Sequence, residues 1–382
     1  MFPLGLNQFV TILNRLENRA LEVHPHQCSR VRHRLSRCTL CADACPTQAI
    51  VFTDSMQVES SRCIDCGVCA TVCPTGALES KSPTNAELLD KIRQRIETNP
   101  SIVFACSKYI ESTHIPSTAI IQVKCLGRLD ESILFGAIAL GAQSVSLLDG
   151  VCADCPQIVG RKIVGETTQK ANALLAAFGV SQQIIFDERR FSQAEMLASS
   201  SEVVSRRGFF DYMLRETIKA GTITASAVLT KDDPTSTNVP LPKGQLPQRV
   251  PAKTDLILTA MRKIGKPVTN QWSKGIWAQF GFTDKCNGCQ ICAFFCPTGA
   301  LAKIEQDSKA GVTFKISTCT DCKLCQQICY QSGVTLAAIT DLNKVVADTV
   351  DTFLMADKTT APWNVAAEDR VKIMLKTTLG IE

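Results

Sequence analysis

The chain has 382 residues, of which 45% are apolar and 20% charged, so at roughly 100–200 residues per domain it is long enough for two to four globular domains. This composition excludes a disordered or collagen-like chain. The 41 Lys and Arg residues against 36 Asp and Glu residues give a net charge of only +5, which is no argument for binding nucleic acid. The 20 cysteines are more informative, because a chain of this length does not need disulfide bonds to stabilise a small core.

The N-terminal segment 1–20 has the pattern of an amphipathic helix, with Phe9, Leu13 and Leu16 on one face. It lacks the apolar segment and small-residue cleavage site of an export signal. The longest apolar run, 133–142, has ten residues including two glycines, about half the length of a membrane-spanning helix. We therefore predict a cytoplasmic protein with no transmembrane segment, in which cysteines are more often metal ligands or redox groups than disulfides.

The cysteines fall into three blocks: eight from Cys28 to Cys73, four from Cys106 to Cys155, and eight from Cys286 to Cys329. The two outer blocks contain an internal repeat. Residues 66–78 and 289–301 have the same cysteine spacing, and in both the last cysteine is followed by Pro-Thr-Gly-Ala-Leu. The same small module therefore occurs twice.

In the first block, one run has the C-x2-C-x2-C-x3-C-P spacing that is typical of thiolate ligands of [4Fe–4S] clusters. Three cysteines on a tight turn direct their sulfurs to one cluster, and the fourth reaches the neighbouring cluster. The preceding run has Leu35 where its first cysteine is expected, and Cys28 is the remaining thiol nearby. The predicted ligand sets are Cys28, Cys38, Cys41 and Cys73 for one cluster, and Cys63, Cys66, Cys69 and Cys45 for the other.

The enlarged loop between Cys28 and Cys38 carries four arginines that we predict to act on the cluster: Arg30, Arg32, Arg34 and Arg37. Positive charge beside an anionic cluster favours its reduced form, so we expect a higher reduction potential here than at the other clusters. Docking of an acidic partner is the alternative role of these arginines. An incomplete [3Fe–4S] cluster is the alternative to a complete [4Fe–4S] cluster at this loop.

Residues 101–190 alternate short apolar runs with helix-like stretches at 129–142 and 157–178, which predicts a small parallel α/β sheet. Cys106 and Cys125 each end a predicted strand, and Cys152 and Cys155 follow the next one. The carboxyl ends of parallel strands meet at one edge of a sheet, so four thiolates converge there and can hold a [2Fe–2S] cluster. A zinc site and a thioredoxin-type dithiol of Cys152 and Cys155 are the alternatives, although the dithiol leaves two cysteines unexplained.

Residues 231–251 are rich in proline and are interpreted as an extended linker between helical segments at 208–220 and 254–264. Arg206 and Arg207 resemble a twin-arginine export motif. They lie far from the N-terminus and lack a following apolar segment, so we interpret them as a charged helix start, with a docking role as the alternative.

The third block has the same spacing twice, and structural zinc is again the alternative. The predicted ligand sets are Cys286, Cys289, Cys292 and Cys329 for one cluster, and Cys319, Cys322, Cys325 and Cys296 for the other. Tyr330 replaces the proline that usually follows the last cysteine. Trp272 and Trp277 are interpreted as packing against this module, and the tail at 341–382 has two weak helical patterns.

On these motifs, residues 28–80 and 284–340 each resemble a bacterial-type ferredoxin domain with two [4Fe–4S] clusters. Residues 101–188 resemble the delta subunit of methyl-viologen-reducing hydrogenases, through the stretch 123–130 and the later Asp154-Cys155. The chain departs from that family at Tyr109, where a second cysteine is expected, and in the close spacing of Cys152 and Cys155. The resemblance implies a [2Fe–2S] cluster and electron transfer between hydrogenase or formate dehydrogenase and heterodisulfide reductase.

The sequence therefore predicts an α+β and α/β multidomain fold, with two ferredoxin-like cluster domains around a small parallel α/β domain. The expected parts are an N-terminal helix and ferredoxin domain (1–98), an α/β domain (99–190), helices and a linker (191–275), a second ferredoxin domain (276–340) and a helical tail (341–382). Four [4Fe–4S] clusters and one [2Fe–2S] cluster would hold about 18 iron atoms.

The expected function is an electron-transfer subunit of anaerobic metabolism that joins a hydrogenase- or formate-dehydrogenase-type enzyme to another redox protein. The sequence has no G-x-G-x-x-G loop after a strand, no Walker loop and no Ser–His–acid set, so we expect no substrate chemistry in this chain. The alternatives are a cluster-based redox sensor or maturation factor, and a self-contained reductase with its substrate at an incompletely ligated cluster.

Overall fold

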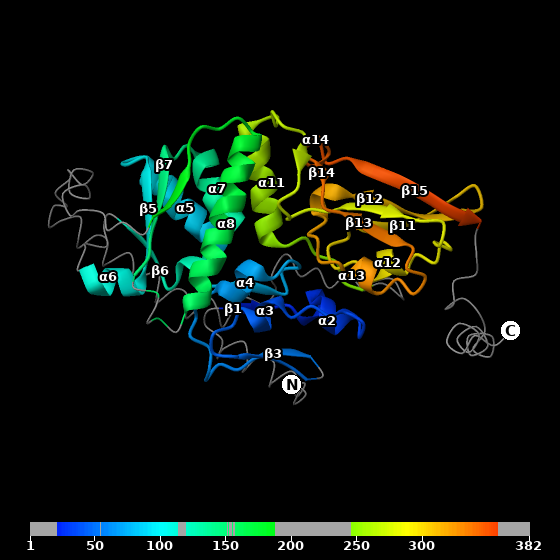
Figure 1. Ribbon diagram of the computed structural model, residues 1–382, viewed down its shortest axis with the longest axis horizontal. Helices are drawn as coiled ribbons and strands as arrows, with labels where there is room; N and C mark the ends of the chain where they lie inside the picture. The colour runs from blue at the N-terminus through cyan, green and yellow to red at the C-terminus, as the bar shows by residue number, and fades with distance from the viewer. Residues whose placement is uncertain are drawn as a thin grey trace, which may run out of the picture. The chain divides into compact units, whose positions relative to one another are not determined.

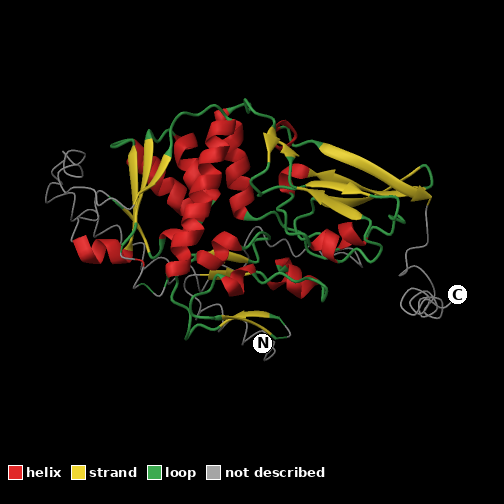
Figure 2. Cartoon of the chain, in the orientation of Figure 1, coloured by secondary structure: helices red, strands yellow, loops and turns green. Residues whose placement is uncertain are grey.

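The computed structural model describes residues 21–53, 55–113, 120–150, 152, 155, 157–187 and 246–357 (Figures 1 and 2). The predicted helix at 1–20, the Arg206–Arg207 motif with the helix at 208–220, and the tail beyond residue 357 lie outside the described residues. None of the described helices combines the length and apolar character that crossing a bilayer requires. The cysteines lie in three segments, named here the N-terminal (21–80), middle (101–187) and C-terminal (271–357) segments.

The middle segment is built on a four-stranded parallel sheet with the strand order β6-β5-β7-β8. Its strands are β5 (Ser101–Cys106), β6 (Ile121–Val123), β7 (Ser144–Leu148) and β8 (Ile184–Asp187). Ile102 and Phe104 in β5 and Val145 and Leu147 in β7 are fully buried. Central strands that are covered on both faces need such continuous apolar runs, and the predicted parallel sheet is confirmed.

Helices cover the sheet and connect it to the rest of the chain. They are α5 (Asn85–Ile96), α6 (Ser107–Thr113), the short η3 (Leu126–Arg128), α7 (Glu131–Leu140), α8 (Ile158–Ala177) and α11 (Ala252–Ile264). Thr84 and Glu87 form a capping box at the start of α5, and the Asp130 carboxylate caps α7. Helix α7 is apolar on every side because it packs against β7, α5, α8 and α11 (Figure 1).

The N-terminal segment consists of short elements around its cysteines. These are β1 (Leu21–Val23), η1 (Pro25–Gln27), α2 (Ser29–Arg32), α3 (Leu40–Asp43), β2 (Ile50–Phe52), β3 (Met56–Val58), α4 (Val68–Val72) and β4 (Leu78–Ser80). Strand β1 pairs with β4, and β2 pairs with β3, both antiparallel. Helices α3 and α4 are single turns that lie within the two cysteine runs and pack against each other.

The C-terminal segment repeats this plan. Its elements are β9 (Gln271–Trp272), β10 (Gln279–Phe282), α12 (Ile291–Phe294), β11 (Leu301–Gln306), β12 (Lys309–Lys315), η5 (Ile316–Thr318), α13 (Leu324–Gln327), β13 (Val334–Ala337), β14 (Thr340–Asp341), α14 (Leu342–Val346) and β15 (Val350–Asp357). The pairs β10–β13 and β11–β12 correspond to β1–β4 and β2–β3, so the sequence repeat is also a structural repeat. Trp272 and Trp277 are buried, as the packing interpretation expects.

The tail differs from its helical prediction. Helix α14 is present, but β15 is a strand that pairs with β12 and completes the sheet β11-β12-β15. Val350, Thr352 and Phe353 are β-branched or aromatic residues that favour a strand. The pairing partner is distant in the sequence, so the local pattern could not show it. The mixed α/β fold class predicted for the chain is otherwise confirmed.

Candidate metal centres

All 20 cysteines carry free thiols, and most are buried or half-buried. Among the residues that the structure describes, no three His, Cys, Asp or Glu side chains are placed to share a single metal ion. A four-iron cluster spreads its ligands over the corners of a cube, so the thiols that bind one cluster must face one another across a common space.

In the N-terminal segment, Cys28 lies with Cys38, Cys41 and Cys73. Burial, followed by the negative charge of Cys73, Cys28 and Cys38, raises the pKa of Cys41 to about 12. Burial also raises the pKa values of Cys28 and Cys38, and the Cys73 thiolate adds to both rises. The enlarged loop thus brings Cys28 close to the Cys38, Cys41 and Cys73 thiols, whereas the Leu35 side chain is half exposed.

The second N-terminal set contains Cys45, Cys63, Cys66 and Cys69. Burial raises the pKa of Cys69 well above its ordinary value, and the thiolates of Cys66, Cys63, Cys41 and Cys45 add to this rise. The influence of Cys41 shows that the two sets adjoin each other. The Ala49 N–H donates to the Cys45 sulfur at 3.2 Å, a contact that stabilises a thiolate.

The four predicted arginines do not act as one group. Arg30, Arg34 and Arg37 are exposed, whereas Arg32 is buried. The positive charge of Arg30 lowers the pKa of Cys38, although burial raises that pKa overall. Arg30 also stacks on the Phe52 ring at 4.5 Å. The thiolates that act on Arg32 are those of Cys296 and Cys322 in the C-terminal segment.

In the C-terminal segment, Cys296, Cys319, Cys322 and Cys325 line one small cavity. Burial raises the pKa of Cys319 to about 12, and the Cys296 thiolate adds to that rise. Burial also raises the pKa of Cys325 well above its ordinary value, and Cys292 of the neighbouring set contributes.

The remaining C-terminal set is Cys286, Cys289, Cys292 and Cys329. Burial raises the pKa values of the first three, and the Cys329 thiolate adds to each rise. The Gly333 N–H donates to the Cys329 sulfur at 3.2 Å. Tyr330, which replaces the usual proline, accepts a hydrogen bond from Asn287 at 2.7 Å and so ties the two cysteine runs together.

In the middle segment, Cys106, Cys125, Cys152 and Cys155 line a second small cavity at the carboxyl edge of the parallel sheet. Burial, the Asp149 carboxylate and the Cys106 thiolate raise the pKa of Cys152 to about 12. Burial also raises the pKa of Cys125 to about 12, with contributions from Cys66 and Cys106. The middle set therefore adjoins the Cys66 set, and Cys66 and Cys125 share a buried apolar cluster.

Asp149 is a residue near the middle set that the sequence motifs did not indicate. Its carboxylate receives a hydrogen bond from the Arg161 Nε at 2.8 Å and lies 3.7 Å from the Cys152 sulfur. The next residue, Gly150, donates its N–H to the Cys106 sulfur at 3.4 Å. The available signal was its position directly after β7, because polar residues at strand ends in parallel sheets line such sites.

The donor set fits iron–sulfur clusters. Burial disfavours the thiolate form of those cysteines whose pKa values are raised, and a bound cationic metal centre reverses that preference. Four hydroxyl groups near the thiols are buried and have no hydrogen-bond partner within the described structure: those of Ser29, Thr71, Thr283 and Thr320. Cluster sulfur atoms accept hydrogen bonds, so clusters in these sites would provide acceptors that the protein alone does not.

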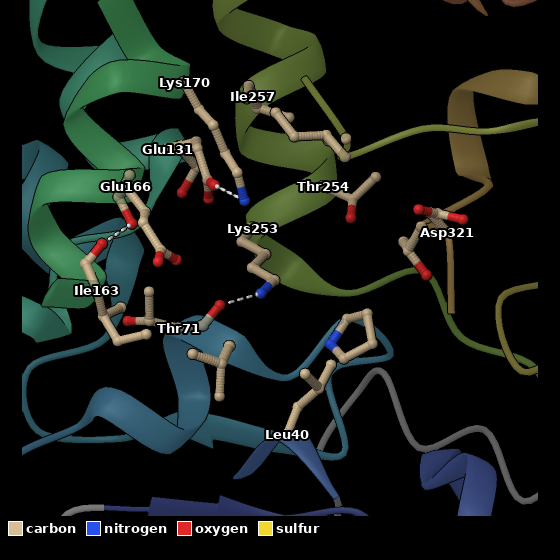
Figure 3. Close-up of a pocket in the computed structure, with 17 residues that line it drawn as sticks. Leu40, Thr71, Glu131, Ile163, Glu166, Lys170, Lys253, Thr254, Ile257 and Asp321 are labelled. Atoms are coloured by element: carbon tan, nitrogen blue, oxygen red, sulfur yellow. Dashed lines mark hydrogen bonds and ion pairs between the residues drawn. The ribbon is translucent and has the colours of Figure 1, made fainter. Parts of the chain in front are cut away.

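A larger cavity of about 320 Å³ lies among α4, α8 and α11 (Figure 3). Its two lysines have partners within the protein. Lys170 pairs with Glu131 at 3.5 Å, and Lys253 donates to the Thr71 carbonyl at 2.7 Å. Its lining contains no cysteine, but it includes Thr71 and Thr320, two of the buried hydroxyls near the thiols.

Comparison with known proteins identifies the domains that carry these cysteines. Residues 36–77 and 285–332 match the protein-family model described as a 4Fe-4S dicluster domain, which leaves Cys28 just outside the matched range. Residues 103–206 match the family model of the methyl-viologen-reducing hydrogenase delta subunit. No curated protein and no solved structure is significantly similar to the chain. The chain therefore carries two 4Fe-4S dicluster domains that flank a segment similar to a hydrogenase delta subunit, an arrangement that supports an iron–sulfur electron-transfer role.

Proposed function

We propose that the chain is an electron-transfer subunit with four [4Fe–4S] clusters and one [2Fe–2S] cluster. The five proposed ligand sets are Cys28, Cys38, Cys41 and Cys73; Cys45, Cys63, Cys66 and Cys69; Cys106, Cys125, Cys152 and Cys155; Cys286, Cys289, Cys292 and Cys329; and Cys296, Cys319, Cys322 and Cys325. Cysteine-held clusters of this kind exchange single electrons with little rearrangement of their ligands. The observation that carries the proposal is that the thiols of each set face one another in the fold.

The order of the sets supports a relay. The middle set adjoins the Cys66 set through Cys125, and the Cys66 set adjoins the Cys28 set through Cys69 and Cys41. In the C-terminal segment, Cys325 adjoins Cys292 of the last set. Sites that follow one another in this way suit passage of charge between distant surfaces better than storage at one isolated centre.

The proposed partners follow from the middle segment. Its similarity to the hydrogenase delta subunit supports a place in a complex with a hydrogenase-type or formate-dehydrogenase-type enzyme. A heterodisulfide-reductase type of protein is the proposed second partner. We propose that this complex is located in the cytoplasm and takes part in anaerobic metabolism.

Metal analysis of the anaerobically purified chain tests the cluster assignment. We expect about 18 iron atoms per chain and, after reduction, a [2Fe–2S] signal in electron paramagnetic resonance that is distinct from the [4Fe–4S] signals. About 16 iron atoms together with one zinc would contradict the middle assignment. A colourless, iron-poor protein would contradict the whole proposal.

Electron transfer is tested separately from cluster content. The chain is reduced by a low-potential donor and then mixed with an oxidised hydrogenase or heterodisulfide-reductase complex. We expect reoxidation of the chain at a rate comparable to turnover of the complex. Clusters that are reduced but never pass electrons at that rate would instead favour the redox-sensor function.

A further inference from the structure

The enlarged loop of the N-terminal segment packs on the C-terminal segment. The His33 ring meets the Phe295 ring edge-on, with ring centres 4.8 Å apart. The Arg37 N–H donates to the Gln327 side chain at 3.1 Å. Residues that interrupt the regular cysteine spacing thus form a contact between the two dicluster domains.

Arg32 lies at the centre of this contact, and its side chain is buried. Its Nε donates to the His26 carbonyl at 2.6 Å, and one terminal nitrogen lies 3.4 Å from the carbonyls of both Phe295 and Cys296. The other terminal nitrogen donates to the Pro247 carbonyl. One guanidinium therefore joins the N-terminal segment, the chain before α11 and the C-terminal segment.

The charge of Arg32 needs a compensating negative group, because a buried and uncompensated cation is costly. Carbonyl dipoles supply part of this compensation. Burial lowers the pKa of Arg32, and the negative charge of Cys296 and Cys322 opposes that effect. In the described part of the chain, the negative groups that act on Arg32 are thus two members of one proposed ligand set.

Ser29 occupies the same contact from the Cys28 side. It directly follows Cys28 in the sequence, is buried, and has a hydroxyl without a hydrogen-bond partner among the described residues. The Ser29 hydroxyl lies close enough to Cys322 to oppose the rise in pKa that burial and Cys296 cause there. A cluster in the Cys322 set would therefore meet both a buried positive charge and a buried hydroxyl from the other domain.

We propose that Arg32 is a positioning residue that docks the N-terminal loop on the C-terminal domain and makes the centre held by Cys296, Cys319, Cys322 and Cys325 easier to reduce. This inference rests on the proposed function, since it requires that set to hold a cluster. It changes the sequence expectation, which assigned Arg32 to the cluster of its own loop. The reason is that the loop is folded against the other domain, so its central arginine faces the partner domain's thiols.

The test is a redox titration of the full chain, followed by electron paramagnetic resonance. A Cys322→Ser variant first identifies the signal that belongs to the Cys322 set, and a Cys41→Ser variant identifies that of the Cys28 set. We expect Arg32→Gln to shift the Cys322 signal to a more negative potential. Arg32→Lys retains the charge and should retain most of the potential of the Cys322 signal, and Arg34→Gln should leave that signal unchanged because Arg34 is exposed.

Several results would overturn the inference. These are an unchanged Cys322 signal in Arg32→Gln, a shift confined to the Cys41 signal, or an equal shift in Arg32→Lys and Arg32→Gln. Arg32→Gln could lose the Cys322 signal and its iron while Arg32→Lys keeps both. The iron content would then by itself show that this centre requires a positive charge at residue 32. A wild-type chain without iron would refute the proposed function, whereas iron-loaded variants with unshifted potentials would refute only the role of Arg32.

Discussion

Replacing Gly160 by alanine tests whether Cys125 is a metal ligand. Gly160 lies in the first turn of α8, against the backbone of Gly127. A β-carbon at residue 160 would stand 2.3 Å from the Cys125 sulfur, whereas ordinary contacts begin at 3.4 Å. The sulfur or the helix must therefore move by about 1 Å, which is several times the tolerance of about 0.2 Å on metal–ligand distances.

Gly160→Ala should destabilise the fold only slightly, although it disturbs the metal site strongly. Alanine is favoured over glycine in a helix by about 1 kcal/mol, and overpacking typically costs about 1–3 kcal/mol. The net loss in unfolding free energy is thus at most about 2 kcal/mol, which leaves most domains folded. We expect Gly160→Ala to lose about two iron atoms and the [2Fe–2S] signal, while the [4Fe–4S] signals remain.

Gly165→Ala is the matched control, because Gly165 lies in the same helix. Its added β-carbon would meet the Phe186 ring at 3.8 Å, an ordinary contact. This variant should keep all its iron and gain up to about 1 kcal/mol in unfolding free energy. Iron analysis and electron paramagnetic resonance of the wild type, Gly160→Ala and Gly165→Ala test whether Cys125 is a metal ligand. A Gly160→Ala protein with full iron and an unchanged [2Fe–2S] signal would refute the assignment of Cys125.

Three further variants test other parts of the chain. Cys28→Ser should reduce the iron content by between one and four atoms per chain, because a three-iron cluster or none is left, and a full iron count would show that Cys28 is not a ligand. Burial opposes ionisation of Glu79, but the His24 imidazole at 3.7 Å and hydrogen bonds from Arg249 and the Ala252 N–H lower its pKa to about 2 from an ordinary value of 4.5. A lowered pKa stabilises the fold above about pH 4.5, so Glu79→Gln should cost up to about 3 kcal/mol in urea unfolding at pH 7, and this difference should shrink as the pH falls from 4.5 toward 2. Thr84→Ala removes the cap of α5 and should lower the unfolding free energy by about 1 kcal/mol without loss of iron, as measured by thermal melting and metal analysis.

The sequence could predict the dicluster modules because their information is local. Three members of each regular set lie within seven residues, and the turn between them is set by that spacing. The parallel sheet was also predictable, since buried strands such as Ser101–Cys106 are continuous apolar runs bounded by helical patterns. In the irregular run, Leu35 indicates which ligand is missing and Cys28 is the remaining thiol nearby, and the assignment of Cys28 as a ligand stays a prediction.

The remaining features depend on contacts between residues that are distant in the sequence. Strand β15 pairs with β12, and its sequence alone was interpreted as helical. Gly127 and Gly160 allow a close approach between η3 and α8, which no local pattern reveals. Arg32 belongs to a loop with four arginines, all of which we predicted to act on the cluster of that loop. Only the packing of that loop on Phe295 shows that one of these arginines is buried and differs from the rest.

The burial of Arg32 links cofactor loading to the assembly of the two dicluster domains. Its guanidinium satisfies four backbone carbonyls but lies in an environment that penalises its charge, and the negative groups that act on it within the described structure are thiolates. Burial raises the pKa of the Cys322 thiol, so this thiol is protonated near neutral pH when no metal is present and then gives no compensation. Metal binding deprotonates it and supplies the negative charge that a buried cation needs. Any group that binds only the folded state stabilises it, so loading the Cys322 set strengthens the contact between the domains, and that contact in turn favours retention of the metal.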